Sequence, residues 1–344
     1  MSDWLGFLSA RGANIVEGVV RDFGDARGEL DAAATASVAA DLSHLGLLRF
    51  AGPDAVAFLH GQVSNDVKGL GPTEARYGGY CTPKGRLLAN FLLWRDGDGV
   101  LMLLSRDVLP AVEKRLRMYV LRSKVTISDV TGEYTAMGAS GPAAPDAVSA
   151  ALGVAAPLPS LGVGRAEAGS VAIRLPGNRF VVVSPRSESE SVWSRLAESL
   201  RPAGTPAWQW LEIANGLPLV TAATQDELVP QMANLELVGG VSFDKGCYPG
   251  QEIVARSQYL GQVKRRTYRA AVSAEEPPRA GEPVYEGADA TQTAGMILNA
   301  APSPAGGYEV LAVMQMAAAE RADLHLRAPN GPALRLLSLP YALP

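Results

Sequence analysis

The chain has 344 residues, of which 47% are hydrophobic, and its 31 basic and 35 acidic side chains give a net charge of -4. This length allows about two or three domains, and the apolar content suffices for packed cores. The near balance of charge gives no reason to expect nucleic-acid binding by bulk electrostatics. The two cysteines exclude a disulfide framework, and with the three scattered histidines they lack the short spacings of a structural zinc site.

The amino-terminal residues do not have the pattern of a targeting segment. Acidic side chains recur through residues 1–30, which fits neither a secretory signal nor a mitochondrial presequence. No apolar run approaches the ~20 residues needed to cross a bilayer. We therefore expect a soluble, cytoplasmic protein with no membrane attachment.

The first part of the chain alternates strand and helix patterns. We expect helices at residues 31–40, 55–62 and 109–121. We expect strands at residues 45–50, 78–81, 87–94, 100–105 and 125–130. The Asp-Gly pairs within 95–99 predict a hairpin turn, because Asp-Gly readily supplies positive φ. This order predicts an α+β unit with a largely antiparallel sheet.

A second α+β unit follows and partly repeats the first. Its expected strands lie at residues 134–139, 171–175 and 180–184, and its expected helices begin near residues 145 and 189. The pattern of strand, Gly-Pro and Asp-Ala-Val occurs at residues 52–56 and again at 141–148, which hints at an internal duplication. Trp208 and Trp210 alternate as on a strand, which would put both indoles on one core face, with stacking on a flat ring system as the alternative.

From Lys264 onward the helical periodicity of the sequence fades. Turns recur at residues 277–278, 281–283 and 306–307, with short apolar runs at 293–298 and 309–314. This pattern predicts a small all-β domain, a barrel or a sandwich.

Residues 245–252, Lys-Gly-Cys-Tyr-Pro-Gly-Gln-Glu, carry the densest chemistry of the chain, and we call them the signature loop. Two glycines and a proline predict a loop. Cys247 lies near the Lys245 cation, an arrangement that favours the reactive thiolate. The alternative is that Cys247 is a small buried hydrophobe, and residue chemistry alone favours that alternative.

Two further segments carry polar groups that could bind a ligand. Asn65 and Asp66 could hold a polar heterocycle, or they could cap and turn the chain. Lys84 and Arg86 lie in a tight turn that could hold an anionic tail, or they could be solvated. The basic cluster at 264–266 is interpreted as solvated surface, with neutralisation of the same anion as the alternative. No P-loop, GxGxxG, HExxH or Ser-His-Asp pattern is present.

The signature loop resembles that of YgfZ-type folate-binding proteins, which are relatives of the glycine-cleavage T-protein, an aminomethyltransferase. The resemblance continues in order over most of the chain, in the strings at residues 41–46, 58–67, 81–86, 95–99, 123–127, 208–218, 230–242, 251–256 and 339–341. It implies an α+β fold, a three-domain T-protein-like ring around a central folate pocket. Residues 1–45 and 131–212 would form the first α+β domain, of ferredoxin-like type. Residues 46–130 would form a second such domain inserted in it, and residues 213–344 would carry the signature loop, within 240–256, and a C-terminal β-barrel.

The resemblance also implies a function. Family members bind tetrahydrofolate, or a one-carbon-substituted form, and support assembly or repair of iron–sulfur clusters. Their clients or scaffolds are transient protein partners and include a tRNA-methylthiolating enzyme, so neither direct nucleic-acid binding nor a bound metal is expected. Cys247 would be the functional thiol, positioned by Lys245. The expected folate-binding residues are Asn65, Asp66, Lys84, Arg86, Tyr248, Gln251 and Glu252, with Glu252 holding the loop through backbone contacts.

The chain departs from the T-protein where that enzyme carries its chemistry. Ala89-Asn90 stands in place of an acidic pair, one member of which is catalytic, and a neutral amide cannot act as a general base. A pterin-binding Gly-Glu-Asp-Gly string is replaced near residues 176–180. Three hypotheses follow: a non-enzymatic maturation factor, which we favour; a folate-dependent aminomethyltransferase-like or demethylating enzyme; and a binding module in which Cys247 is inert.

Overall fold

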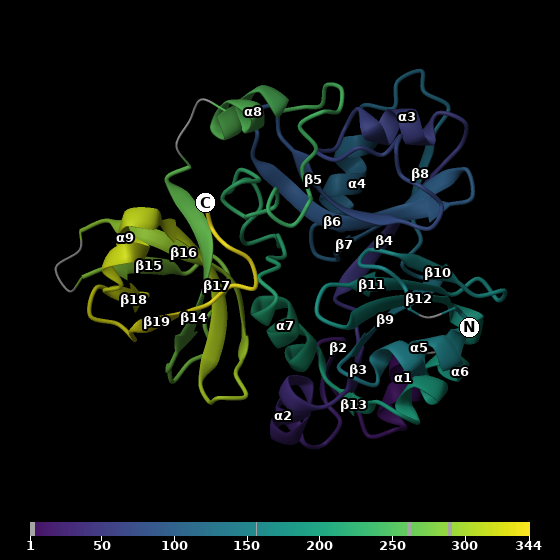
Figure 1. The fold of residues 1–344 in the computed structure, drawn as a ribbon, viewed down its shortest axis with the longest axis horizontal. Helices are drawn as coiled ribbons and strands as arrows, with labels where there is room; N and C mark the ends of the chain where they lie inside the picture. The colour runs from purple at the N-terminus through teal and green to yellow at the C-terminus, as the bar shows by residue number, and fades with distance from the viewer. Residues whose placement is uncertain (1–3, 156, 260–262, 288–290) are drawn as a thin grey trace. The chain divides into compact units, whose positions relative to one another are not determined.

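The computed structural model describes residues 4–155, 157–259, 263–287 and 291–344 (Figure 1). Contacts divide the chain into two compact units, each made of several segments. Unit 1 comprises Met1–Val56, Gly69–Arg76 and Leu92–Leu211. Unit 2 comprises Ala57–Lys68, Tyr77–Phe91 and Glu212–Pro344.

A six-stranded mixed sheet in unit 1 has the strand order β10-β11-β12-β9-β3-β13. Its strands are β3 (Val38–Asp41), β9 (Tyr134–Ser140), β10 (Val163–Arg165), β11 (Val171–Leu175), β12 (Arg179–Pro185) and β13 (Arg201–Ala203). All pairs are antiparallel except β13 with β3, which is parallel. The run of valines in β12 is buried, which suits a strand inside a sheet.

Helices complete the core around this sheet. They are α1 (Trp4–Ser9), α2 (Ala26–Thr35), α5 (Ala144–Leu152), α6 (Arg186–Ala197) and α7 (Thr205–Ala214), and a small hairpin is formed by β1 (Asn14–Val16) and β2 (Val19–Asp22). Trp4 and Trp193 pack edge to face with ring centroids 5.7 Å apart. The indole N–H of Trp4 donates to the buried Asp41 carboxylate at 2.7 Å, so the amino-terminal helix is tied to β3.

A five-stranded sheet has the order β5-β6-β7-β4-β8. Its strands are β4 (Leu45–Ala51), β5 (Ala75–Cys81), β6 (Leu87–Asp96), β7 (Gly99–Ser105) and β8 (Thr126–Asp129), and its helices are α3 (Ala55–His60) and α4 (Leu109–Arg117). The turn between β6 and β7 contains Gly97 at φ +57°, which fits the Asp-Gly prediction.

The C-terminal region forms a curled antiparallel sheet with the order β18-β15-β16-β17-β14-β19 (yellow in Figure 1). Its elements are β14 (Arg265–Val272), β15 (Pro283–Glu286), β16 (Thr293–Pro302), β17 (Tyr308–Gln315), α9 (Met316–Arg321), β18 (Leu324–Leu326) and β19 (Leu334–Leu337). An antiparallel bridge from His325 to Ala333 joins β18 to the residue just before β19. Small and branched side chains such as Ala312 and Val284 fill its interior.

Three predicted elements were wrong in their bounds or type. The alanine-rich helix runs over 26–35, because Asp25 caps it by accepting from the Gly28 amide at 3.0 Å, and residues 38–41 form a strand in the mixed sheet. The helix expected to reach residue 121 ends at Arg117. Trp208 and Trp210 lie on α7 and not on a strand, and only Trp208 is fully buried.

The tight packing of Trp208 gives a test of the unit 1 core. A Cβ added at Gly138 on β9 would lie 2.5 Å from two ring atoms of Trp208. We expect Gly138→Ala to cost about 1–3 kcal/mol by overpacking, seen as a lower midpoint of thermal unfolding. Gly132→Ala is the matched control, because no atom lies within 4 Å of its added Cβ. Equal midpoints for both variants would contradict this packing.

Candidate functional site

The signature loop belongs to unit 2 and leads into helix α8 (Gln251–Tyr259). Gly250 has φ +82°, a conformation that glycine adopts without strain. The Gln251 amide donates to the Tyr248 carbonyl at 3.2 Å, and the Val254 amide donates to the Gly250 carbonyl at 3.2 Å. Gln251 and Glu252 therefore form the first turn of α8, where a carboxylate is favoured by the helix dipole.

Lys245 clamps the loop onto the end of α3. Its ammonium donates to the carbonyl oxygens of His60 at 2.5 Å and Val63 at 2.8 Å. The same ammonium lies 4.6 Å from the ring centroid of Tyr248, as a cation–π contact. Burial lowers the pKa of Lys245 from 10.5 to about 8, while Asp66 and Cys247 oppose this change. The lysine is thus occupied in holding the loop.

Cys247 is exposed, and Cys81 is buried. Burial raises the pKa of the Cys81 thiol to about 12, which makes that thiol inert at neutral pH. Tyr248 is buried beside Cys81, and burial raises the pKa of its phenol as well. Within the signature loop, Lys245 and Tyr248 face inward and the thiol between them faces solvent.

Two segments far apart in sequence are joined beside the loop. Ser64 donates from its hydroxyl to the Gly240 carbonyl at 2.6 Å and accepts from the Gly79 amide at 2.8 Å. Asn65 donates to the carbonyls of Tyr77 and Gly239, each at 2.7 Å. Both amide hydrogens of Asn65 are therefore used by the backbone, and only its Oδ1, which already accepts from the Asp66 amide, has further capacity.

His60 joins this cluster, although the sequence reasoning assigned it no role. Its Nδ1 lies 3.0 Å from Oδ1 of Asp66. Burial and the Lys245 charge lower the pKa of His60, and Asp66 partly opposes this. In the sequence, His60 and Asp66 stand on either side of the turn that ends α3. A histidine and an aspartate at this spacing are common, so the sequence alone does not predict that they meet.

The turn at residues 81–86 lies against the signature loop. A Cβ added at Gly250 would lie 2.4 Å from the Thr82 carbonyl oxygen and 2.6 Å from the Gly85 Cα, so the two backbones touch. Lys84 is exposed beside this contact. Arg86 is exposed too, and its guanidinium donates to the Glu227 carbonyl at 2.8 Å.

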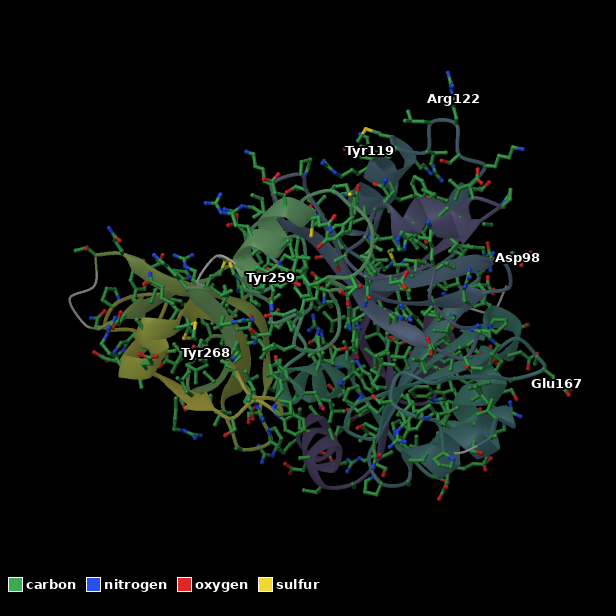
Figure 2. The ribbon with its side chains drawn as sticks, turned by 45° about the horizontal axis from the view of Figure 1, so that its top comes forward. Asp98, Tyr119, Arg122, Glu167, Tyr259 and Tyr268 are labelled. Carbon is green, nitrogen blue, oxygen red and sulfur yellow. The ribbon has the colours of Figure 1, made fainter. Side chains whose placement is uncertain are left out.

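The far end of the loop segment is also anchored. Tyr259, at the end of α8 (Figure 2), packs edge to face against Phe243 with ring centroids 5.8 Å apart. Gln231 donates from its side chain to the Val254 carbonyl at 2.7 Å. Residues on both sides of Cys247 are therefore held by side chains from elsewhere in unit 2.

The structure brings together most of the residues expected at the site. Asn65, Asp66, Lys245 and Tyr248 lie in one cluster. Lys84, Gln251 and Glu252 lie on the turn and the helix that adjoin it. The expected backbone contacts of Glu252 are not seen among the described residues, and its side chain is exposed.

The basic cluster at 264–266 is only partly solvated, contrary to expectation. Arg266 is 4% exposed, pairs with the Glu236 carboxylate and donates to the Gln231 carbonyl at 2.9 Å. Lys264 and Arg266 contribute to the lining of a pocket of about 570 Å³ between α8 and α9. Within the described part of the chain, no three His, Cys, Asp or Glu side chains are grouped to hold a metal ion, and none of the helices has the length and apolarity to cross a membrane.

Comparison with known proteins shows the family. Residues 20–245 match the GCVT N-terminal domain. The protein named tRNA-modifying protein YgfZ from Serratia proteamaculans is 31% identical over 301 residues, which cover 86% of this chain and 90% of that protein. The protein of the same name from Edwardsiella ictaluri is 31% identical over 299 residues, covering 86% and 89%. The chain therefore belongs to the YgfZ family of GCVT-domain proteins.

A solved structure shows the fold. The glycine cleavage system aminomethyltransferase T from Bartonella henselae superposes with a TM-score of 0.81, at 18% identity, covering 97% of this chain and 96% of that one. The chain thus has a T-protein-like fold, with mixed α/β sheets and a curled antiparallel half-barrel.

The Ser64 bridge gives a test of how the site is held. Ser64→Ala leaves the buried Gly79 amide and Gly240 carbonyl without their side-chain partner. We expect a loss of about 2 kcal/mol or more in the free energy of unfolding, measured by urea denaturation. Ser257→Ala is the control, because the Ser257 hydroxyl only bonds back to the Ile253 carbonyl on the exposed side of α8. A Ser64 variant as stable as this control would count against the bridge.

Proposed function

We propose that this protein is a tetrahydrofolate-binding accessory factor for assembly or repair of iron–sulfur clusters in client enzymes, including tRNA-modifying enzymes. The observation that carries the proposal is the exposed Cys247 thiol on a loop whose Lys245 and Tyr248 are buried. Relatives at 31% identity are named tRNA-modifying proteins, which supports the link to those enzymes. The proposal includes the expected three-domain organisation and a cytoplasmic location.

Three buried acceptor groups of unit 2 support the proposal of a reduced folate. The side-chain oxygens of Gln62, Gln231 and Asn234 are buried and accept no hydrogen bond from the residues that the structure describes. A pterin ring offers N–H donors of the kind that such acceptors need. Lys84 supplies an exposed cation for the carboxylates of the glutamate tail. When bound, the folate would supply one-carbon chemistry, and these residues would hold and orient it.

An aminomethyltransferase-like activity is the alternative, and the surroundings of Asn90 count against it. The Asn90 amide nitrogen donates to the Pro218 carbonyl at 2.7 Å, and its oxygen accepts from the Val220 amide at 2.7 Å. Asn90 is therefore a bridge between backbone segments, and no carboxylate stands at that position. An aspartate there could not donate to the Pro218 carbonyl.

A transient role for the thiol follows from the cysteine count. Iron–sulfur clusters in proteins are usually held by about four thiolates. The chain has two cysteines, and Cys81 is buried. Cys247 can contribute one sulfur to a cluster or a client that supplies the other ligands, so we propose an accessory factor and not a permanent cluster carrier.

Complementation tests the role of the thiol. In a strain lacking the gene, we expect Cys247→Ala to fail to restore the activity of a [4Fe–4S] tRNA-modifying enzyme, because the variant removes only the exposed sulfur. Cys81→Ala is the control, and it should restore activity if its protein level matches wild type. Equal rescue by both variants would show that Cys247 is dispensable and would support the inert-cysteine alternative.

Calorimetric titration with tetrahydrofolate tests the ligand independently of the thiol. We expect saturable binding to the wild type and about tenfold weaker binding to Lys84→Ala, because a charge-assisted hydrogen bond contributes about 1.5 kcal/mol or more. Lys124→Ala, which removes an exposed cation in unit 1, should bind like wild type. No heat with tetrahydrofolate or its one-carbon forms would overturn the folate assignment.

A further inference from the structure

We propose that residues 114–122, where helix α4 ends, form a binding surface for unpaired segments of RNA. The segment reads Lys-Arg-Leu-Arg-Met-Tyr-Val-Leu-Arg, and we call it the basic turn. The inference goes beyond the proposed function and rests on it only for the choice of tRNA as the test RNA. It involves neither Cys247 nor the residues proposed to bind folate.

The basic turn concentrates positive charge on a chain whose net charge is -4. Four of its nine residues are Lys or Arg, and none is Asp or Glu. Lys114 and Arg122 are exposed, and neither side chain pairs with a carboxylate among the residues that the structure describes. Arg117 differs, because its guanidinium lies 2.7 Å from the Glu113 carboxylate. The overall charge, which gave no reason to expect nucleic-acid binding, averages over this cluster, and the cluster itself favours an anionic partner.

Apolar side chains lie among these cations and face solvent. Three of the six exposed large hydrophobic residues in the described part of the chain are here: Met118, Tyr119 and Leu121, which are 60%, 39% and 87% exposed. Leu121 has φ +45°, in the left-handed region that residues other than glycine rarely adopt. Backbone strain and an exposed apolar cluster together point to a binding surface and not to a stabilising contact.

The backbone of the basic turn is held in one conformation. The amides of residues 118–120 donate in succession to the carbonyls three residues back, at 3.0–3.3 Å. The Arg117 guanidinium donates to the Ile127 carbonyl on β8 at 2.8 Å, and just beyond the turn the Lys124 amide donates to the Asp54 carboxylate at 2.7 Å. In Figure 2 the Arg122 side chain points away from unit 1. A surface ordered in this way loses little conformational entropy when a partner binds.

An RNA segment with unpaired bases matches both features of the basic turn. Its phosphates are anions that Lys and Arg bind, and its bases present flat faces that stack on aromatic side chains. Arg117 lies before the apolar side chains and Arg122 after them, so phosphates can be bound on both sides of a base stacked on Tyr119. The bases of a duplex are covered by stacking and pairing, so a single-stranded loop fits this surface better.

A lipid surface fits the basic turn less well. The apolar side chains of α4 itself, Leu109, Val112 and Leu116, are buried. Helices that bind at a membrane surface insert a whole apolar face into the lipid. Only the three apolar side chains of the turn would remain to insert, so we favour RNA and make lipid, together with an acidic protein surface, an alternative outcome of the test.

Binding of fluorescein-labelled, unfractionated tRNA to the purified full chain tests the surface with no folate or client present. Fluorescence anisotropy gives the Kd at several KCl concentrations from about 50 to about 200 mM. We expect saturable binding that weakens as salt rises, because each phosphate contact releases counterions. No saturable binding at the lowest salt concentration would overturn the proposal.

The charge of the basic turn is tested by the double variant Lys114→Ala with Arg122→Ala. We expect its binding to be about tenfold weaker, and the slope of log K against log[KCl] to be shallower by about 2. Arg279→Ala with Arg335→Ala is the matched control, because both arginines are exposed in unit 2 and the variant has the same net charge. An unchanged Kd in the basic-turn variant, or an equal loss in the control, would contradict a local site.

Substitution of Tyr119 separates stacking from charge. We expect Tyr119→Ala to bind tRNA about tenfold more weakly with an unchanged salt dependence, because stacking on a base involves no charge. Tyr119→Phe keeps the aromatic ring and should bind like wild type. Circular dichroism and the midpoint of thermal unfolding establish that each variant is folded. A folded Tyr119→Ala protein that binds tRNA as tightly as wild type would exclude the RNA surface.

Two further ligands distinguish RNA from other anionic partners. Vesicles of phosphatidylcholine with phosphatidylserine represent lipid, and poly-L-glutamate represents an acidic protein. We expect both to bind more weakly than tRNA and to be insensitive to Tyr119→Ala. Tighter binding of either ligand, lost in Tyr119→Ala, would replace RNA by that partner. Absence of tRNA binding in a protein that still binds tetrahydrofolate and restores client activity would overturn this inference alone and leave the proposed function standing.

Discussion

The site depends on one buried cation. Lys245 is 8% exposed and is held by two carbonyl oxygens near the end of α3 and by the ring of Tyr248. Burial disfavours its charge, yet a pKa of about 8 still leaves the ammonium mostly protonated at neutral pH. Hydrogen bonds to a charged group contribute about 1.5–3 kcal/mol each, which offsets part of the desolvation. An apolar side chain of the same length would leave both carbonyls without this donor.

This clamp determines what the neighbouring residues can do. With Lys245 and Tyr248 directed inward, the loop presents Cys247 to solvent. Ser64 and Asn65 hold the preceding segment through Gly239 and Gly240. The backbone on both sides of the thiol is therefore held in place, so the thiol has a defined position. Little conformational entropy of the loop would be lost when a partner binds there.

The fold was largely predictable from local pattern, and the site was predictable only in part. Turn residues and apolar alternation located most strands, because those signals lie within a few residues of each other. Trp208 was misassigned because two aromatic residues two positions apart occur in both strands and helices. Its burial against Gly138 is a contact between distant parts of the chain, which a local pattern does not reveal. Arg266 was expected at the surface because its partner Glu236 lies 30 residues away in sequence.

The signature loop was recognised by its composition, but its partners were not. The motif suggested Lys245 as the residue that positions Cys247, whereas in the structure the lysine ammonium binds carbonyl oxygens of another segment. Backbone carbonyls have no sequence signature, so a clamp of this kind cannot be found from residue types. The same limit hid His60, since its carbonyl binds the Lys245 ammonium across 185 positions of the chain.

The double use of His60 couples the structure of the loop to the charge of the imidazole ring. Its carbonyl binds the Lys245 ammonium, and its ring lies between Asp66 and Gly246. Any movement that lengthens the carbonyl contact also moves Nε2 relative to the loop. A charge gained by the ring would in turn repel the Lys245 ammonium. The charge of the ring and the integrity of the clamp are therefore linked, because both depend on the same residue at the end of α3.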